Sequence, residues 1–361
     1  MPISKVYDTW KRKLAQMRPK ERISRVKTMA WLMAGIYFGR TVQLGRVASL
    51  IPGRVFRNSV VRRLERLVAN AQIRVREWYE PVIRPILKAQ EGREYRLVVD
   101  GSKVGPWHQL LLVSLAYRHR TIPLAWMWIP KSRGHSSAAR QLALLCYVHG
   151  LLPVGAQGLL VGDQEFGAIE VLKQLDQWHW QYALRQKSNE LFRPDANTPW
   201  KAFGSVIDKP GQQVWLGEVE YTQQHVYRTH LLAYWQVGEP EPWLLATNLT
   251  SPQPALKAYR RREWTEGTFG DLKDNGFDLE SSRLHTAMHL HRLTLAVMLL
   301  YLDLLATGSR VIKDGLRSLV DRSNRRDLSI FRIGLYSRNR CLANELHFSI
   351  QLLPVLCQTV G

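Results

Sequence analysis

Short apolar runs follow one another between residues 95 and 185, and this succession constrains the fold more than any other feature of the chain. Such runs, bounded by turn formers, are typical of buried strands, whereas longer amphipathic patterns indicate helices. A meander of three strands that continues into alternating helices and strands predicts an α/β core. The predicted strands are 95–100, 109–117, 121–129, 158–162 and 180–185, and the predicted helices are 136–149 and 167–177.

Two of the predicted strands lead directly into an aspartate. Asp100 ends the run Tyr-Arg-Leu-Val-Val-Asp and precedes Gly101 and Ser102, and Asp163 ends the run Gly-Leu-Leu-Val-Gly-Asp. A single aspartate after a strand is usually a turn former or a helix cap. Two of them, together with a glutamate on a later helix, are a less common combination and indicate a cluster of carboxylates.

Tyr259, Arg262, Glu266 and Lys273 form the most distinctive motif, with the spacing Y-x2-R-x3-E-x6-K. The surrounding residues 253–273 predict a helix, on which positions three, four and seven apart share one broad face. That face would carry a carboxylate able to bind a hard divalent metal ion, between cations able to neutralise phosphate oxygens. This pattern favours phosphodiester chemistry. The alternative is a solvated helix on which Arg262 and Glu266 form an i,i+4 ion pair.

The motifs Asp100-Gly-Ser, Gly162-Asp163-Gln-Glu-Phe-Gly and Tyr-Arg-Glu-Lys occur in the order found in DDE transposases of bacterial insertion sequences. Over nearly its whole length the chain resembles the branch named for the Y-R-E-K signature. The resemblance implies a ribonuclease-H-like core, in which the first and fourth strands end side by side and the two aspartates converge. Ser102 departs from the threonine that is common in the family. Gln164 replaces a common arginine, which removes a cation beside Asp163.

The resemblance also implies a two-metal centre. Asp100 would bridge two divalent ions, and Asp163 and Glu266 would be the outer ligands. Two-metal phosphoryl transfer places the ions about 4 Å apart, where one activates the attacking oxygen and the other stabilises the leaving oxygen. Mg²⁺ is the expected ion because it prefers hard oxygen ligands, and Mn²⁺ could substitute. Glu165 is a lower-ranked ligand, since neighbouring residues at a strand end point to opposite sides.

By the same resemblance, Tyr259, Arg262 and Lys273 would bind phosphates near the transposon end and help to hold a DNA hairpin with a flipped base. Trp243 lines up with a tryptophan that probes the vacated base position in relatives, and Trp264 could stack on the flipped base. For both tryptophans the favoured alternative is an aromatic side chain packed in the core.

The chain is strongly basic, with a formal net charge of +21 and a pI near 10.2. Residues 1–96 contain 22 Lys and Arg against 7 Asp and Glu, a net charge of 22 − 7 = +15. Such an excess implies a polyanionic partner, and its concentration in one segment favours double-stranded DNA over a membrane surface.

The basic segment 1–94 predicts a helical DNA-binding domain. Helices are expected at 29–38, 42–50 and 57–69, an arrangement of the size of a helix-turn-helix unit. In the third helix apolar residues can face a small core while the arginines project outward. Whether these arginines read bases or only contact phosphates is left open, as is a plain basic surface helix. The arginines are Arg57, Arg62, Arg63 and Arg66.

The remaining residues extend the core in two directions. Residues 187–242 alternate strands with turn formers and predict an all-β insertion, after which a strand at 243–248 returns to the core. The family branch carries such an insertion between its second aspartate and its glutamate. The core is expected to comprise 95–186 and 243–308, and 309–361 to form a basic helical C-terminal region. Helices are predicted at 286–307 and 309–323.

Other residues bear on location and on rival sites. The apolar run 293–302 is too short to span a bilayer and predicts a buried core helix. Three distant cysteines fit a reducing cytoplasm and ordinary packing. They are Cys146, Cys341 and Cys357. His285, His289 and His291 could in principle bind a metal, but helix-face histidines without a carboxylate partner favour a structural role.

These observations predict an insertion-sequence transposase that binds terminal inverted repeats, cuts at the element ends and joins the 3′ ends to target DNA. The resemblance implies a homodimer that synapses two ends, in the bacterial cytoplasm at the nucleoid. Two alternatives remain open: a catalytically inactive DNA-binding relic of such an element, and a ribonuclease-H-like nuclease without strand transfer.

Overall fold

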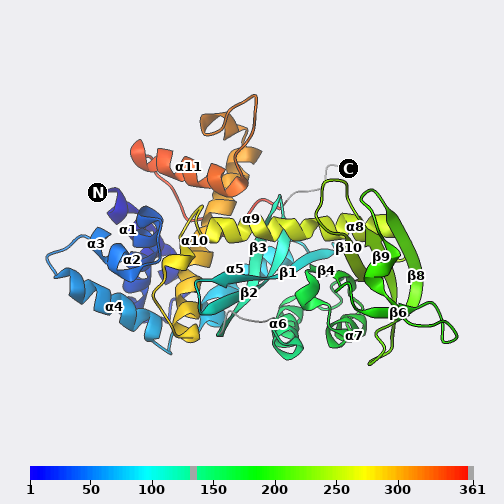
Figure 1. The fold of residues 1–361 in the computed structure, drawn as a ribbon. Coiled ribbons are helices and arrows are strands. Elements are labelled where there is room, and N and C mark those ends of the chain that lie inside the picture. Colours follow the sequence, from blue (N-terminus) through cyan, green and yellow to red (C-terminus); the bar gives the residue numbers. More distant parts are fainter. Residues whose placement is uncertain (131–135, 357–361) are drawn as a thin grey trace.

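The computed structural model describes residues 1–130 and 136–356. It is a mixed α/β protein with helices at both ends of the chain and one large sheet between them (Figure 1). Five helices gather at the N-terminal end. They are α1 (Pro2–Met17), α2 (Ile23–Gly39), α3 (Leu44–Leu50), α4 (Arg57–Ala69) and α5 (Val75–Lys88).

The helix predicted at 57–69 is confirmed as α4, but α1 and α5 were not predicted. α1 is amphipathic only through a narrow stripe, because Val6, Trp10 and Leu14 recur every four residues and are buried. α5 contains Pro81 and Pro85, which ordinarily interrupt a helix. Its apolar face is nevertheless buried, and the Tyr79 hydroxyl donates to the carbonyl of Pro123 at 2.7 Å.

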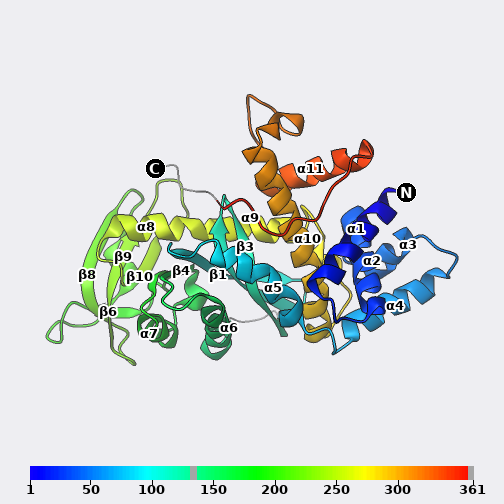
Figure 2. The same ribbon diagram turned by 180° about the vertical axis from the view of Figure 1, so that it is seen from behind.

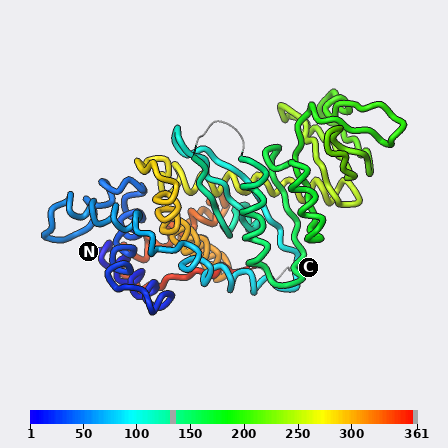
Figure 3. Tube along the Cα trace, turned by 90° about the horizontal axis from the view of Figure 1, so that it is seen from below, coloured from blue at the N-terminus to red at the C-terminus, as the bar shows by residue number. Residues whose placement is uncertain are grey.

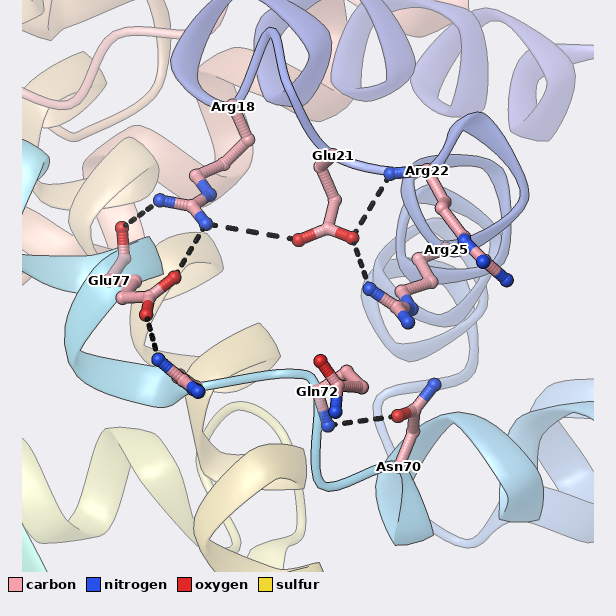
Figure 4. Close-up of polar contacts among 8 residues, drawn as sticks. Arg18, Glu21, Arg22, Arg25, Asn70, Gln72 and Glu77 are labelled. Carbon is pink, nitrogen blue, oxygen red and sulfur yellow. Dashed lines mark hydrogen bonds and ion pairs between the residues drawn. The ribbon is translucent and has the colours of Figure 1, made fainter.

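Charged residues join the α1–α2 turn to the start of α5 (Figure 4). Arg18 donates to the carboxylate of Glu77 at 2.8 Å and to its carbonyl at 3.0 Å, and Arg74 donates to the same carboxylate at 3.1 Å. Hydrogen bonds from Arg18 and Arg74 lower the pKa of Glu77. Glu21 pairs with Arg25 at 2.7 Å. The pairs of Arg18 and Arg74 with Glu77 are accessible to solvent and fix geometry more than they add stability, whereas the side chain of Glu21 is 5% exposed.

The ten strands form a single sheet in the order β3-β2-β1-β4-β5-β10-β9-β8-β6-β7. β4 lies parallel to both β1 and β5, and the other neighbours are antiparallel. The strands of the core are β1 (Tyr95–Val104), β2 (His108–Tyr117), β3 (Arg120–Pro130), β4 (Gly158–Gly162), β5 (Gln181–Arg185) and β10 (Trp243–Thr247).

Helices cover the two faces of this core. α6 (Ala138–Leu151) and α7 (Ile169–Gln177) lie on one face, and α8 (Pro252–Tyr259) and α9 (Glu263–Leu272) run along the other (Figures 1 and 2). The predicted order of strands and helices is therefore confirmed. The end of the first strand was wrong, because its antiparallel pairing with β2 continues past Asp100 to Val104.

The predicted β-rich segment extends the core sheet. Its strands are β6 (Leu191–Arg193), β7 (Lys201–Ala202), β8 (Gln213–Tyr221) and β9 (Tyr227–Tyr234). β10 pairs with β5 on one side and with β9 on the other, so backbone hydrogen bonds run without a break from the core into the insertion. Figure 3 shows the insertion at the opposite end of the molecule from the N-terminal helices.

α10 (Ala287–Lys313) lies between the N-terminal helices and the sheet (Figure 1). By length and composition it is the one described helix that could cross a membrane, but 83% of its most apolar window is buried inside the protein. It is a core helix, as predicted. The separate helix predicted at 309–323 is wrong, because α10 continues to Lys313 and only the short 3-10 helix Leu316–Leu319 follows.

Two glycines explain why α10 continues past residue 307. Gly308 of α10 and Gly334 of α11 (Ile330–Ala343) allow close helix contact. A Cβ on Gly308 would overlap the carbonyl oxygen of Ile330, and one on Gly334 would overlap the carbonyl oxygen of Leu304. From the sequence alone, Gly308 is expected to interrupt a helix, but in the structure it lets α10 and α11 pack closely.

Replacing Gly334 by alanine is expected to lower the free energy of unfolding by about 1–3 kcal/mol, because the helices must separate to admit the methyl group. Urea unfolding measures the change. Gly150→Ala is the matched control, since its Cβ meets no atom within 4 Å and alanine is the better helix former. Equal stability of Gly334→Ala and the wild type would show that the contact between α10 and α11 is loose.

Candidate active site

Strand register brings the two predicted aspartates together. Val99 of β1 pairs with Gly162 of β4 in the parallel ladder, so Asp100 and Asp163 are the next residues at the same point of neighbouring strands. Asp100 is buried, with 8% of its surface exposed, and Asp163 is half-buried. The predicted convergence of the two carboxylates is confirmed.

Backbone amides orient both carboxylates. The amide of Gly101 donates to Asp100 Oδ1 at 2.8 Å, and the amide of Gln164 donates to Asp163 Oδ1 at 2.8 Å, where Asp163 caps the 3-10 helix Gln164–Phe166. Asp163 thus also acts as the local cap that a structural interpretation expects, whereas Asp100 lies within β1 and caps no helix. Both carboxylates keep a second oxygen that these amides do not use.

Arg185 is a site residue that the sequence did not reveal. It ends β5, which runs parallel to β4, and its Nη1 lies 3.9 Å from Asp163 Oδ1. Its guanidinium also donates to the carbonyl of Pro242 at 3.0 Å and pairs with Glu241. Arg185 thus places a cation beside Asp163, whose neighbour in the chain, Gln164, carries no charge. Its position at the end of the strand after Asp163 is the signal that could have identified it.

The signature motif is helical but is interrupted by a 3-10 turn at Arg260–Arg262 between α8 and α9. A 3-10 helix turns by more degrees per residue than an α-helix, so this turn changes the spacing of side chains along the motif. Tyr259 packs into an apolar cluster with Val98 and Leu159, whereas the side chain of Glu266 is 59% exposed. Arg262 nevertheless lies near both, because its charge acts on Tyr259 and its guanidinium donates to Glu266. These three residues stay neighbours, as predicted, although Tyr259 is buried and Glu266 is exposed.

Arg262 links the third predicted carboxylate to the first. Its Nη2 donates to Glu266 Oε1 at 2.6 Å, and its Nη1 lies 3.7 Å from Asp100 Oδ2. The i,i+4 pair that the structural alternative expected is therefore formed. The same guanidinium, however, also faces the buried aspartate, so Asp100, Arg262 and Glu266 form one charged cluster.

Burial raises the pKa of Asp100 to about 7. Arg262 and the Gly101 amide oppose this rise, and the negative charges of Asp163 and Glu266 add to it. Asp163 and Glu266 are thus near enough to Asp100 for their charges to act on it. A second cation at this site would favour the ionised form of Asp100.

The donors at this site fit a hard divalent ion in their chemistry, because all three are carboxylates. Their spacing does not form a closed set of ligands. Within residues 1–130 and 136–356, no three His, Cys, Asp or Glu side chains are close enough to hold a metal ion together. Arg262 pairs with Glu266 and faces Asp100. Its guanidinium would have to move away from both carboxylates before Asp100, Asp163 and Glu266 could bind one metal centre.

Tyr259 and Trp243 form an aromatic wall behind the carboxylates. Their rings meet edge to face with centroids 5.0 Å apart, and the centroid of the Trp243 ring lies 5.7 Å from that of Tyr234. Tyr259 is 2% exposed, and its hydroxyl has no hydrogen-bond partner among the described residues. Burial raises its pKa. Trp243 is half-buried. The structure brings both close to the site, and their DNA contacts remain predictions.

Lys273 ends α9 and is engaged within the chain. Its Nζ donates to the carbonyl of Lys103 at 2.5 Å and pairs with Glu280 at 2.7 Å. It thereby ties α9 to the far end of β1. Trp264 is half-buried and its ring lies 4.9 Å from that of His119. Neither position tests the predicted DNA contacts.

Glu165 lies in a 3-10 helix, so the strand alternation used to rank it does not apply. Its carboxylate accepts from Gln109 at 3.0 Å, from the amide of Ser136 at 2.6 Å and from the Ser136 hydroxyl. This network holds the start of α6 against β2. Glu165 is therefore a structural residue beside the site.

The three candidate histidines are spread over the start of α10 and the loop before it. His291 packs against Trp126 at 5.5 Å, and burial lowers its pKa to about 4. The carbonyl of His285 contacts His108 Nε2 at 3.0 Å. His289 lines a groove of about 690 Å³ between α4 and α10.

The arginines of α4 divide into two groups. Arg57 donates to Ser49 Oγ at 2.7 Å and to the carbonyl of Gly45 at 2.8 Å, so it joins α4 to α3. Arg62, Arg63 and Arg66 are exposed, and Arg62 and Arg66 line the groove that contains His289. Arg57 is exposed as well, so the predicted outward orientation is confirmed for all four arginines.

The buried Asp100 makes the stability of the fold depend on pH. Its folded pKa of about 7 lies above the ordinary aspartate value of 3.8, so between these pH values the folded state retains a proton that the unfolded state has released. The stabilisation is complete below about pH 4 and is lost as the pH rises to about 7. We expect Asp100→Asn, which abolishes this titration, to be more stable than the wild type by about 1–3 kcal/mol at about pH 8.

Urea unfolding without divalent metal, repeated across this pH range, measures the effect. The advantage of Asp100→Asn should shrink as the pH falls and be smallest near about pH 4. A difference that does not change with pH would contradict the raised pKa.

Several chains of solved structures are similar to this chain. The cryo-electron microscopy structure of a piggyBac transposase synaptic complex with hairpin DNA is similar to this chain, with a TM-score of 0.40 and 11% identity. The similarity covers 99% of this chain and 84% of that chain. No protein-family model matches the chain, and no curated protein matches its sequence. A likeness this weak does not assign a function.

Proposed function

We propose that the chain is a DNA transposase that binds the terminal inverted repeats of an insertion sequence, cleaves at the element ends and joins the 3′ ends to target DNA. The observation that carries the proposal is the juxtaposition of Asp100 and Asp163 on neighbouring parallel strands, with Glu266 linked to Asp100 through Arg262. The order β3-β2-β1-β4-β5 supports assigning the core to the ribonuclease-H-like class.

In this proposal Asp100, Asp163 and Glu266 hold two Mg²⁺ ions, for which Mn²⁺ could substitute. When bound, the ions would activate the attacking oxygen and stabilise the leaving oxygen of phosphoryl transfer. Amides of Gly101 and Gln164 keep the aspartates oriented. Arg262 neutralises the carboxylates in the resting chain, and after release it would be free to fork onto phosphate oxygens of the DNA.

The partners follow from charge and chemistry. The net charge of +15 in residues 1–96 supports binding of double-stranded DNA by the N-terminal helices. Arg62, Arg63 and Arg66 are exposed there and can reach phosphates. A homodimer on paired transposon ends, a hairpin intermediate and a location at the bacterial nucleoid belong to the same proposal.

A strand-transfer assay tests the proposal. The full chain is incubated with Mg²⁺, a supercoiled plasmid and a pre-cut duplex that ends in the DNA flanking its own gene. We expect the 3′ end to become joined to the plasmid. Cleavage of an uncut duplex without joining would indicate a nuclease, and binding without either product would indicate a DNA-binding relic.

A further inference from the structure

The connection between α3 and α4 presents two apolar side chains to solvent. Phe56 is 87% exposed and the neighbouring Val55 is 52% exposed. Figures 1 and 3 show this connection at the far tip of the N-terminal helices, away from the sheet. Single exposed apolar residues are common on protein surfaces. An adjacent pair of exposed apolar residues, one of them a phenylalanine, at a projecting tip is a stronger indication of a contact surface than a single residue would be.

The sequence on both sides of this tip is basic. Residues 22–64 contain nine lysines and arginines and no aspartate or glutamate. Arg54 directly precedes the apolar pair and Arg57 directly follows it. An apolar tip that binds another protein has no need of such a surrounding, whereas one that binds a polyanion does.

The position of Phe56 is fixed by its neighbours. Phe56 is the N-cap residue of α4, and its carbonyl accepts from the amide of Ser59 at 2.9 Å. Arg57 then anchors the start of the helix to the carbonyl of Gly45 and to Ser49 Oγ. A Cβ on Gly45 would lie 2.9 Å from the Arg57 guanidinium, so this anchor depends on the glycine. The contacts of Arg57 thus fix the start of α4, from which the exposed ring of Phe56 projects.

We propose that Phe56 inserts between base pairs of bound duplex DNA as a wedge, with the surrounding arginines on the phosphates. Proteins that bind the minor groove commonly insert Phe, Leu, Ile, Met or Pro between base steps, and this unstacks the step and kinks the duplex. Phe56 supplies the apolar wedge, and Arg54, Arg62 and Arg63 supply cations on either side of it. The inference rests on the proposed function, because it requires that the chain binds DNA.

Affinity and bending of DNA test this role. The full chain is titrated into a fluorescent duplex of roughly 30 base pairs, at several salt concentrations, and energy transfer between dyes at the two ends reports the bend. Phe56→Ala should weaken binding by about tenfold and reduce the bend. Because no charge is removed, the slope of log affinity against log salt should not change. Arg63→Gln should instead lower that slope by about 1.

Two further variants separate the wedge from a change in folding. Phe56→Leu should keep most of the bend, since leucine is also a wedge residue. Val154→Ala removes another fully exposed apolar side chain, in the connection between α6 and β4, and should change nothing. Because Phe56 is exposed, the thermal unfolding midpoint of Phe56→Ala should match that of the wild type.

Three other outcomes would contradict the proposed role of Phe56, and each differs from the others in what is measured. Equal affinity and equal bending by Phe56→Ala and the wild type would remove the wedge and leave the proposed DNA binding intact. Absence of DNA binding by all variants would remove the proposed function itself. Binding of the wild type, but not of Phe56→Ala, to anionic phosphatidylglycerol vesicles, with DNA binding unchanged, would assign the tip to a membrane surface.

Discussion

Glu266→Gln is expected to reduce Mg²⁺-dependent DNA cleavage by on the order of 10⁴-fold, the size of effect seen when one member of a catalytic set is removed. The substitution keeps the shape of the side chain and removes the charge that a divalent ion requires. It also weakens the 2.6 Å ion pair with Arg262, whose guanidinium also faces Asp100. The initial rate of nicking of an end-bearing duplex on a denaturing gel measures the change.

Glu263→Gln is the matched control for this prediction. Glu263 is an exposed glutamate three residues earlier on the same helix. Its replacement should leave the nicking rate within a few-fold of the wild type, while both variants should bind DNA with wild-type affinity. Full activity of Glu266→Gln would remove Glu266 from the catalytic set and leave the interpretation of α9 as a surface helix.

Arg338→Met is expected to lower the free energy of unfolding by about 3–5 kcal/mol, the largest stability effect among these predictions. Arg338 Nη2 donates to both oxygens of Asp303, at 2.9 and 3.0 Å, and both side chains are 4% exposed. It also donates to Thr307 Oγ1 at 2.9 Å. Without the arginine, Asp303 would be a buried carboxylate that keeps only the amide of Gln351 as a donor among the contacts described.

Urea unfolding at two pH values measures this effect and its cause. Burial raises the pKa of Asp303, and Arg338 opposes the rise. Removing Arg338 should raise that pKa further, so the defect should be large near neutral pH and smaller in acid, where the carboxyl is protonated. Arg340→Met, two residues later on α11 and exposed, should change stability by less than about 0.5 kcal/mol. A defect of equal size in both variants would contradict the importance of the buried pair.

The sequence predicted the strands of the core well because strand signals are local. The runs before Asp100 and Asp163 are apolar and are bounded by turn formers, so their pairing needed little further information. The parallel register that joins Val99 to Gly162 then followed from chain order and the family resemblance. What the sequence did not contain is the extension of β1 past Asp100, because that depends on the partner strand.

The parts of the site that sequence reasoning missed depend on contacts between distant segments. Arg185 lies near Asp163 because β5 runs beside β4, and in the sequence only its place at the end of the strand after Asp163 indicates this. Tyr259 is buried in an apolar cluster and is followed by a 3-10 turn, and helix periodicity predicts neither. From the sequence, Gly308 indicates the end of a helix, whereas in the structure it lies against the backbone of α11. Local patterns identified the carboxylates, and tertiary packing decided what surrounds them.

The central claim is that Asp100, Asp163 and Glu266 make this chain a metal-dependent DNA-cutting and DNA-joining enzyme. The most direct measurement incubates the purified full chain with Mg²⁺ and a duplex carrying both ends of the DNA that flanks its gene, beside Asp163→Asn, and resolves nicked, hairpin and joined products on a denaturing gel. We predict products from the wild type alone, and only with Mg²⁺ or Mn²⁺. Products of equal yield from Asp163→Asn, or from the wild type in EDTA, would contradict the claim.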